Sequence, residues 1–84
     1  MTIKENLLER QIGERYFLNS SDNGSCVYIM NETTYMIYSF IKEGREIPEI
    51  IDRLFDEFDV DKSELETDVK ACIKDMINAG VIIQ

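Results

Sequence analysis

The sequence predicts one α+β domain spanning residues 1–84, in which a small N-terminal antiparallel β-sheet, a hairpin or three strands, packs on three helices. Two short apolar runs flank a turn signal near the N-terminus, and three later stretches repeat their apolar residues at helical spacing. The chain shows no linker, internal repeat or low-complexity segment, and 84 residues suffice for a single core.

The predicted hairpin consists of the runs RYFLNS and SCVYIM, which are rich in aromatic and β-branched residues. Between them lies SSDNGS, whose Asp-Asn-Gly favours a tight turn. Both faces of the second run are apolar, because side chains alternate along a strand: Cys26, Tyr28 and Met30 on one face, Val27 and Ile29 on the other. The pattern of residues 1–13 fits a short helix and a strand equally well.

The first helix is predicted from Glu32 to about Glu43. Asn31 is suited to the N-cap, because its side-chain oxygen can accept a hydrogen bond from a free amide of the first turn. Gly44 suits the left-handed position after the C-terminus. Apolar side chains surround most of this helix, so we expect it to lie between the sheet and the later helices.

A second helix opens with Pro48 in its first turn and carries an acidic outer face. Its expected buried face is Ile47, Ile50, Ile51, Leu54, Phe55 and Phe58. A third helix opens where Asp61 can cap and Glu64 can reach back in a capping box. Its expected buried stripe is Leu65, Val69, Cys72, Ile73 and Met76. Gly80 should end it, with Val81 touching Met76, before a short extended tail that is a candidate last strand.

Charge and composition exclude several classes of function. Seventeen acidic and nine basic residues give a net charge of -8, which repels nucleic acid and anionic lipid. The chain has no apolar stretch of membrane-spanning length and no signal peptide, so we expect a cytoplasmic protein. It has no histidine, and Cys26 and Cys72 lie far apart, so neither a zinc site nor histidine-based catalysis is expected. We therefore expect no cofactor, no metal and no enzymatic activity.

From residue 30 onward the chain carries a series of short motifs, beginning with Met30-Asn31-Glu32-Thr33-Thr34 and ending with Gly80-Val81. Taken together, these motifs resemble the PqqD-like family, the peptide-recognition elements of ribosomally made, modified peptides. The resemblance covers roughly residues 13 to 82 and rests on the order and spacing of several short motifs. These are Met30-Asn31-Glu32-Thr33-Thr34, Ile37-Tyr38, Phe40-Ile41, Glu43-Gly44, Ile47, Glu49-Ile50, Leu54, Phe58, Asp68-Val69, Met76 and Gly80-Val81. The chain departs from the family pattern at Met30, Thr34 and Tyr38, where the family has Leu, Ala and Trp.

The resemblance implies a winged-helix-like fold of three strands and three helices, and a chaperone-like role without catalysis. Such domains hold the leader of a precursor peptide and present its core to a modifying enzyme, often a radical S-adenosylmethionine (SAM) enzyme or a cyclodehydratase. The family's leader adds as a strand to the third strand, against the third helix.

We therefore predict that the run from Cys26 to Met30 is the accepting edge strand, because it is apolar on both faces. The predicted peptide-binding residues are Cys26, Val27, Tyr28, Ile29, Met30, Val69, Lys70, Ile73, Lys74 and Ile77. Lys70 and Lys74, one turn apart, are candidates to meet acidic groups of a leader, or else are simply solvated. The two cysteines would border the groove, and we expect them to be reduced.

Two alternatives stay open. A winged-helix-like DNA-binding module fits the same elements, but its reading helix needs a basic surface that the third helix lacks. A self-associating interaction domain would pair the same edge strand with a second copy, so a homodimer is one expected state. The acidic face of the second helix is a candidate surface for a modifying enzyme.

Overall fold

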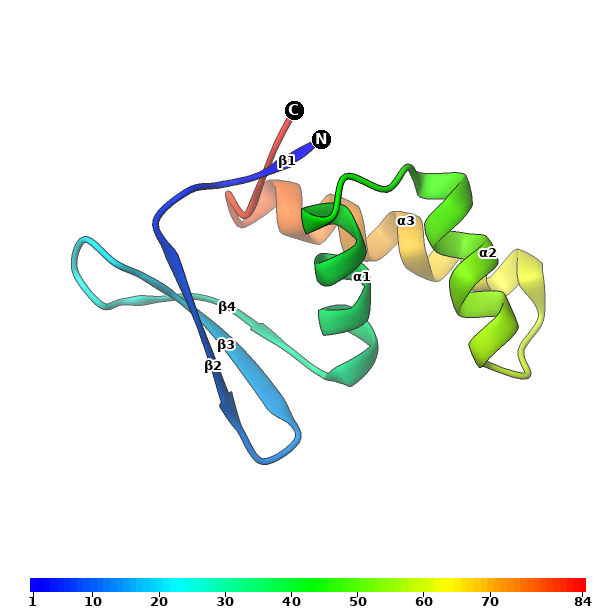
Figure 1. Cartoon of the computed structure of the whole chain (residues 1–84), viewed down its shortest axis with the longest axis horizontal. Helices are drawn as coiled ribbons and strands as arrows, with labels where there is room; N and C mark the ends of the chain where they lie inside the picture. Colours follow the sequence, from blue (N-terminus) through cyan, green and yellow to red (C-terminus); the bar gives the residue numbers. More distant parts are fainter.

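The computed structural model describes all 84 residues and has the predicted α+β architecture. Figure 1 shows α1 in the centre, with β2, β3 and β4 on one side, α2 on the other, and α3 running behind α1. The elements are β1 (Thr2–Ile3), β2 (Leu7–Ile12), β3 (Arg15–Ser20), β4 (Cys26–Met30), α1 (Glu32–Lys42), α2 (Ile47–Glu57), α3 (Lys62–Asn78) and β5 (Ile82–Ile83). The three-stranded sheet and the three helices confirm the predicted fold.

The N-terminal residues, which the sequence left unassigned, form two strands. β1 pairs with β5 in antiparallel fashion, so the two ends of the chain lie together (Figure 1). The Lys4 N–H extends this pairing by donating to the Val81 carbonyl at 2.8 Å. β2 pairs along its whole length with β3 and gives the larger sheet the order β2-β3-β4.

The larger sheet is a meander of two hairpins. β2 and β3 are joined by the two residues Gly13 and Glu14, and Gly13 has the positive φ of +61° that such a turn requires. β3 and β4 are joined by the predicted Asp-Asn-Gly turn, in which the Asn23 side chain accepts from the Ser25 N–H at 3.0 Å. This hairpin is confirmed.

Local capping signals set the bounds of α1 and α3 as predicted. The Asn31 side chain accepts from the Thr34 N–H at 2.8 Å, and Gly44, two residues after the last residue of α1, has a φ of +87°. The Asp61 side chain accepts from the Ser63 N–H at 2.8 Å. At the other end of α3, the Val81 N–H donates to the Met76 carbonyl at 2.8 Å, and both side chains are fully buried.

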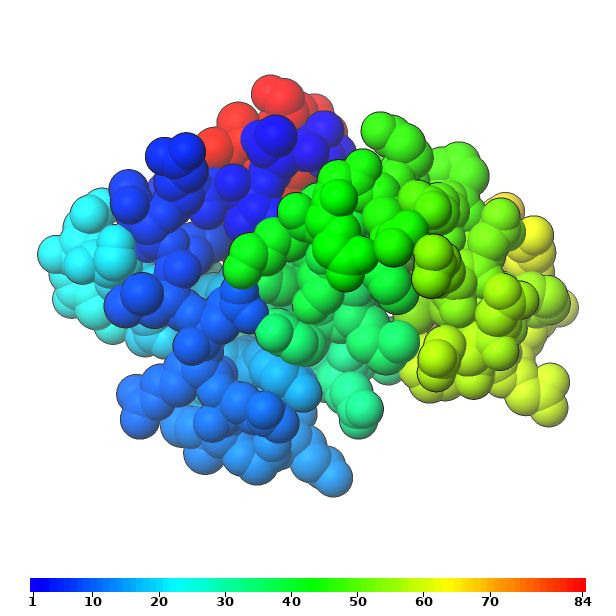
Figure 2. Space-filling model, viewed as in Figure 1, coloured from blue at the N-terminus to red at the C-terminus, as the bar shows by residue number.

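The core contains 14 buried residues, all hydrophobic, contributed by β3, β4, β5, the three helices and Val81. α1 contributes Ile37, Tyr38 and Ile41 to this core. This burial explains how a helix with apolar side chains around most of its circumference can be stable. The expected buried face of α2 is partly wrong, because Phe55 and Phe58 are 41% and 36% exposed. In the space-filling view the β2–β3 hairpin projects at the lower left, and α2 lies at the opposite end of the molecule (Figure 2).

A polar network fixes β2 to α1. The Glu9 carboxylate accepts hydrogen bonds from three groups of α1: the Tyr35 hydroxyl at 2.8 Å, the Tyr38 hydroxyl at 3.4 Å and the Lys42 ammonium. Burial acts to raise the pKa of Glu9, but the bonds from Lys42 and the tyrosines outweigh it and hold the pKa below that of an ordinary glutamate. Burial and the Glu9 carboxylate raise the pKa of Tyr38 to about 12.

We expect Glu9→Gln to lower the free energy of unfolding at neutral pH by roughly 1 kcal/mol, because it weakens this network. Since the pKa of Glu9 is lower in the folded state, its stabilisation is complete above the unfolded value and is lost as pH falls through the folded value. Urea unfolding should therefore give a lower free energy of unfolding for Glu9→Gln than for the wild type at about pH 7, and similar values for the two proteins at about pH 3. Glu14→Gln, at an exposed and unpaired turn residue, is the control and should change nothing. An equal loss at both pH values would contradict the role of the Glu9 charge.

Candidate functional site

β4 is an edge strand whose second side is open. It pairs only with β3. The Ser20 N–H donates to the Ser25 carbonyl at 2.8 Å, so the even-numbered residues of β3 direct their peptide groups toward β4. Ile29 lies opposite the odd-numbered Phe17, and its N–H and C=O therefore point to the free side of β4. An extended peptide could hydrogen-bond to them.

A β-bulge at Val27 changes the expected alternation of side chains along β4. Leu18 lies opposite Tyr28, but the next residue, Asn19, lies opposite Cys26, so Val27 is the extra residue. Val27 and Tyr28 are both half-buried against the core, whereas Cys26 and Ile29 are exposed. The predicted face of Cys26, Tyr28 and Met30 is therefore wrong at Cys26, because the bulge shifts the pleat by one residue.

The side of α3 that faces β4 carries Cys72 and Asp75. Burial raises the pKa of the Tyr28 hydroxyl, and the nearby Cys72 and Asp75 raise it further. Burial likewise raises the pKa of the Cys72 thiol, which also interacts with the Thr34 side chain at the start of α1. We call the free side of Cys26–Met30, together with Thr34, Cys72 and Asp75, the β4 margin. None of the three cavities of the structure lies there, and strand addition requires an open edge rather than a cavity.

The predicted residues of α3 are not brought to this margin. Val69 and Ile73 are 0% and 5% exposed, so their side chains are part of the core. At 100° per residue, Lys70 and Lys74 lie about 160° around the helix from Cys72, and Ile77 lies about 140° away. The three flanking residues therefore lie on the side of α3 away from Tyr28. On β4, Met30 is also in the core, at 1% exposure, and only its backbone belongs to the edge.

Sequence reasoning missed Thr34 and Asp75. Asp75 lies three residues after Cys72, on the same side of the helix, so the placement of Cys72 beside β4 was the signal that could have identified it. Both cysteines are free thiols, as expected. The exposed Cys26 and half-buried Cys72 lie on the two elements that form the β4 margin.

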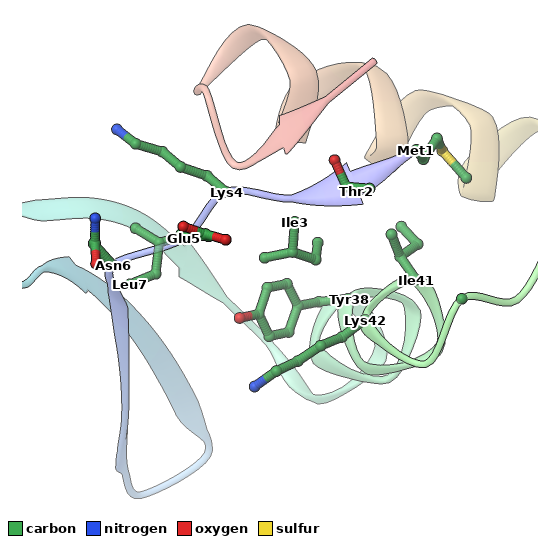
Figure 3. A pocket seen from close by; sticks show the side chains of 11 residues that line it. Met1, Thr2, Ile3, Lys4, Glu5, Asn6, Leu7, Tyr38, Ile41 and Lys42 are labelled. Carbon is green, nitrogen blue, oxygen red and sulfur yellow. The ribbon is translucent and has the colours of Figure 1, made fainter.

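The largest cavity, about 590 Å³, lies elsewhere, between the N-terminal segment and α1. Figure 3 shows Ile3 directed toward Tyr38, with Lys42 and Glu5 at the rim. None of the predicted peptide-binding residues lines it.

No group of three or more metal-ligating side chains is assembled anywhere in the chain. None of the three helices has the length and apolar character to cross a bilayer.

Comparison with known proteins places the chain in a family. Residues 16–82 match the family model described as "Coenzyme PQQ synthesis protein D (PqqD)". A solved structure of TbiB1 in complex with the TbiA(beta) leader peptide is 22% identical, with a TM-score of 0.81, over 96% of this chain and 93% of that chain. A lasso peptide synthetase B1 complexed with the leader peptide is 17% identical, with a TM-score of 0.83, over 98% and 95%. No curated protein sequence matches significantly. Since this match covers well over half of the chain, the chain belongs to the PqqD family.

Proposed function

We propose that this protein binds the leader of a ribosomally synthesised precursor peptide without catalysing a reaction, and delivers that peptide to a modifying enzyme such as a radical SAM maturase. The leader adds to β4 as a further antiparallel or parallel strand, beside α3. The observation that carries the proposal is the open edge of β4, with the peptide group of Ile29 directed outward and the half-buried Tyr28 next to α3. Family membership and two similar folds described with leader peptides support it.

The division of labour follows from the chemistry of strand addition. Main-chain hydrogen bonds to β4 supply affinity for any extended peptide, and side chains beside the strand select among peptides. Thr34, Cys72 and Asp75 are the side chains best placed to select. A cytoplasmic location is part of the proposal, since free thiols such as Cys26 and Cys72 persist in a reducing compartment.

Backbone amide NMR tests the proposal directly. The isolated protein is titrated with a candidate leader segment, the N-terminal part of any short peptide that is found to be encoded beside its gene. We expect shifts concentrated from Cys26 to Met30 and at Cys72 and Asp75, with Lys70 and Lys74 unaffected. The β2 edge, equally unpaired, is the internal control. Absence of shifts at β4 would refute leader binding, and concentration-dependent mass without peptide would favour self-association through the same edge.

A further inference from the structure

We propose that a cavity beyond the Thr34–Cys72 end of the β4 margin is a side-chain subsite for a lysine or arginine of the leader, an inference that rests on the proposed function. The cavity has a volume of about 210 Å³ and lies where α1 begins, α2 ends and α3 begins. Its lining residues are Thr33, Phe58, Val60, Glu64, Leu65 and Asp68.

The position of the cavity continues the path of an added strand. Tyr28 lies beside Cys72 and Asp75, and the next contact along α1 and α3 is between Thr34 and Cys72. One turn further toward the start of α3, Asp68 lines the cavity. Asp68 lies roughly 10 Å along α3 from Asp75, at about 1.5 Å per residue, which equals about three residues of an extended strand. Because strand side chains alternate between two faces, the subsite would receive a leader side chain about two or about four residues beyond the one opposite Tyr28, on the same face.

The walls of the cavity are apolar and unusually accessible. Phe58 and Val60 are 36% and 44% exposed, although their neighbour Leu65 belongs to the core. Exposed apolar side chains gathered at a cavity are typical of binding sites. A volume of about 210 Å³ is enough for one long side chain. These walls suit the methylene stem of lysine or arginine.

The two carboxylates that line the cavity, those of Glu64 and Asp68, favour a positively charged head group at its opening. Glu64 was expected to bond back to the start of α3, but its carboxylate takes part in none of the hydrogen bonds or four ion pairs, and neither does that of Asp68. No lysine or arginine lines the cavity. A long cationic side chain buries its stem on apolar walls while its head group reaches the two carboxylates. An acidic leader residue would be repelled from the same place.

The test uses the full chain and the leader segment defined above, at low and at moderate salt. We expect the methyl signals of Val60 and Leu65 to shift together with the β4 amides. We expect Asp68→Asn combined with Glu64→Gln to weaken binding roughly fivefold at low salt and to reduce its salt dependence. Glu66→Gln combined with Glu46→Gln removes the same charge from exposed sites outside the cavity and should leave affinity nearly unchanged.

The outcomes separate this inference from the proposed function. If the β4 amides shift but the methyl signals of Val60 and Leu65 do not, the subsite is overturned and leader binding stands. The same holds if the double variant Asp68→Asn with Glu64→Gln binds the leader as tightly as the wild type. A leader whose lysines and arginines can all be replaced by glutamate without loss of affinity would overturn it equally. If the amide signals of β4 do not shift, both the subsite and the proposed leader binding are overturned.

Discussion

Replacing Ile29 by proline should weaken leader binding at least about tenfold while leaving the protein folded. The N–H of Ile29 points away from β3, so proline removes no hydrogen bond of the sheet, and edge strands tolerate proline at such positions. An added strand, however, loses a main-chain donor in the middle of β4, and each such hydrogen bond contributes about 0.5–1.5 kcal/mol. The altered φ also misaligns the neighbouring peptide groups, which adds to the loss. Calorimetric titration with the leader segment measures the affinity, and urea unfolding measures the fold.

The matched control lies on the other edge of the same sheet. The two-residue turn makes Ile12 and Arg15 a hydrogen-bonded pair, so the peptide group of Ile12 points toward β3. The preceding residue, Gln11, therefore directs its N–H and C=O to the open side of β2. Gln11→Pro should therefore preserve leader binding. Equal loss of affinity in both variants would show that the leader does not distinguish the edges, and wild-type affinity for Ile29→Pro would exclude strand addition at β4.

Replacing Leu18 by alanine should reduce the free energy of unfolding by about 2–5 kcal/mol. Leu18 is fully buried at the centre of the middle strand, opposite Tyr28 on β4 and Glu9 on β2. Removal of its side chain leaves a cavity between the sheet and α1 that this small domain cannot easily close. The loss is a large fraction of the 5–15 kcal/mol typical of single domains, so urea unfolding should show an obvious shift of the midpoint.

Leu8 provides the same chemical change on the opposite face of the same sheet. It is 58% exposed and lies beside Asn19, one position from the Glu9–Leu18 pair. Leu8→Ala should change the free energy of unfolding by less than about 0.5 kcal/mol. A similar cost at both positions would mean that the strand register is wrong, because a slip of one residue exchanges the two faces.

Much of the fold was predictable because its signals are local. Asn31 and Asp61 cap the two helices that follow them, and Gly44 and Gly80 end helices with the positive φ that glycine adopts most easily. Each of these signals acts within about one helical turn, so neighbouring residues suffice to predict it. The family motifs, which consist mostly of core positions, identified the fold for the same reason.

The candidate site was only partly predictable, because it depends on which sides of distant elements meet. The edge strand was identified from its composition, but the bulge at Val27 depends on pairing with Leu18 and Asn19 in another strand. Sequence spacing placed Lys70 and Lys74 on one side of α3 without showing which side faces Tyr28. The spacing of Phe58 from the apolar residues of α2 predicted a buried side chain, whereas Phe58 is partly exposed at the wall of an open cavity.

Local signals along the chain were enough to predict the ends of α1 and α3, the β3–β4 hairpin, the family and the acidic character of this protein. The packed fold was needed to show that the N-terminal residues form β1 and β2, that β4 carries a bulge, and that Cys72 and Asp75 face this strand. The physical reason is the range of the interactions. Caps and turns are made within a few residues, whereas strand pairing and the rotation of α3 follow from burying one common core, to which residues from β3 to Ile82 contribute together.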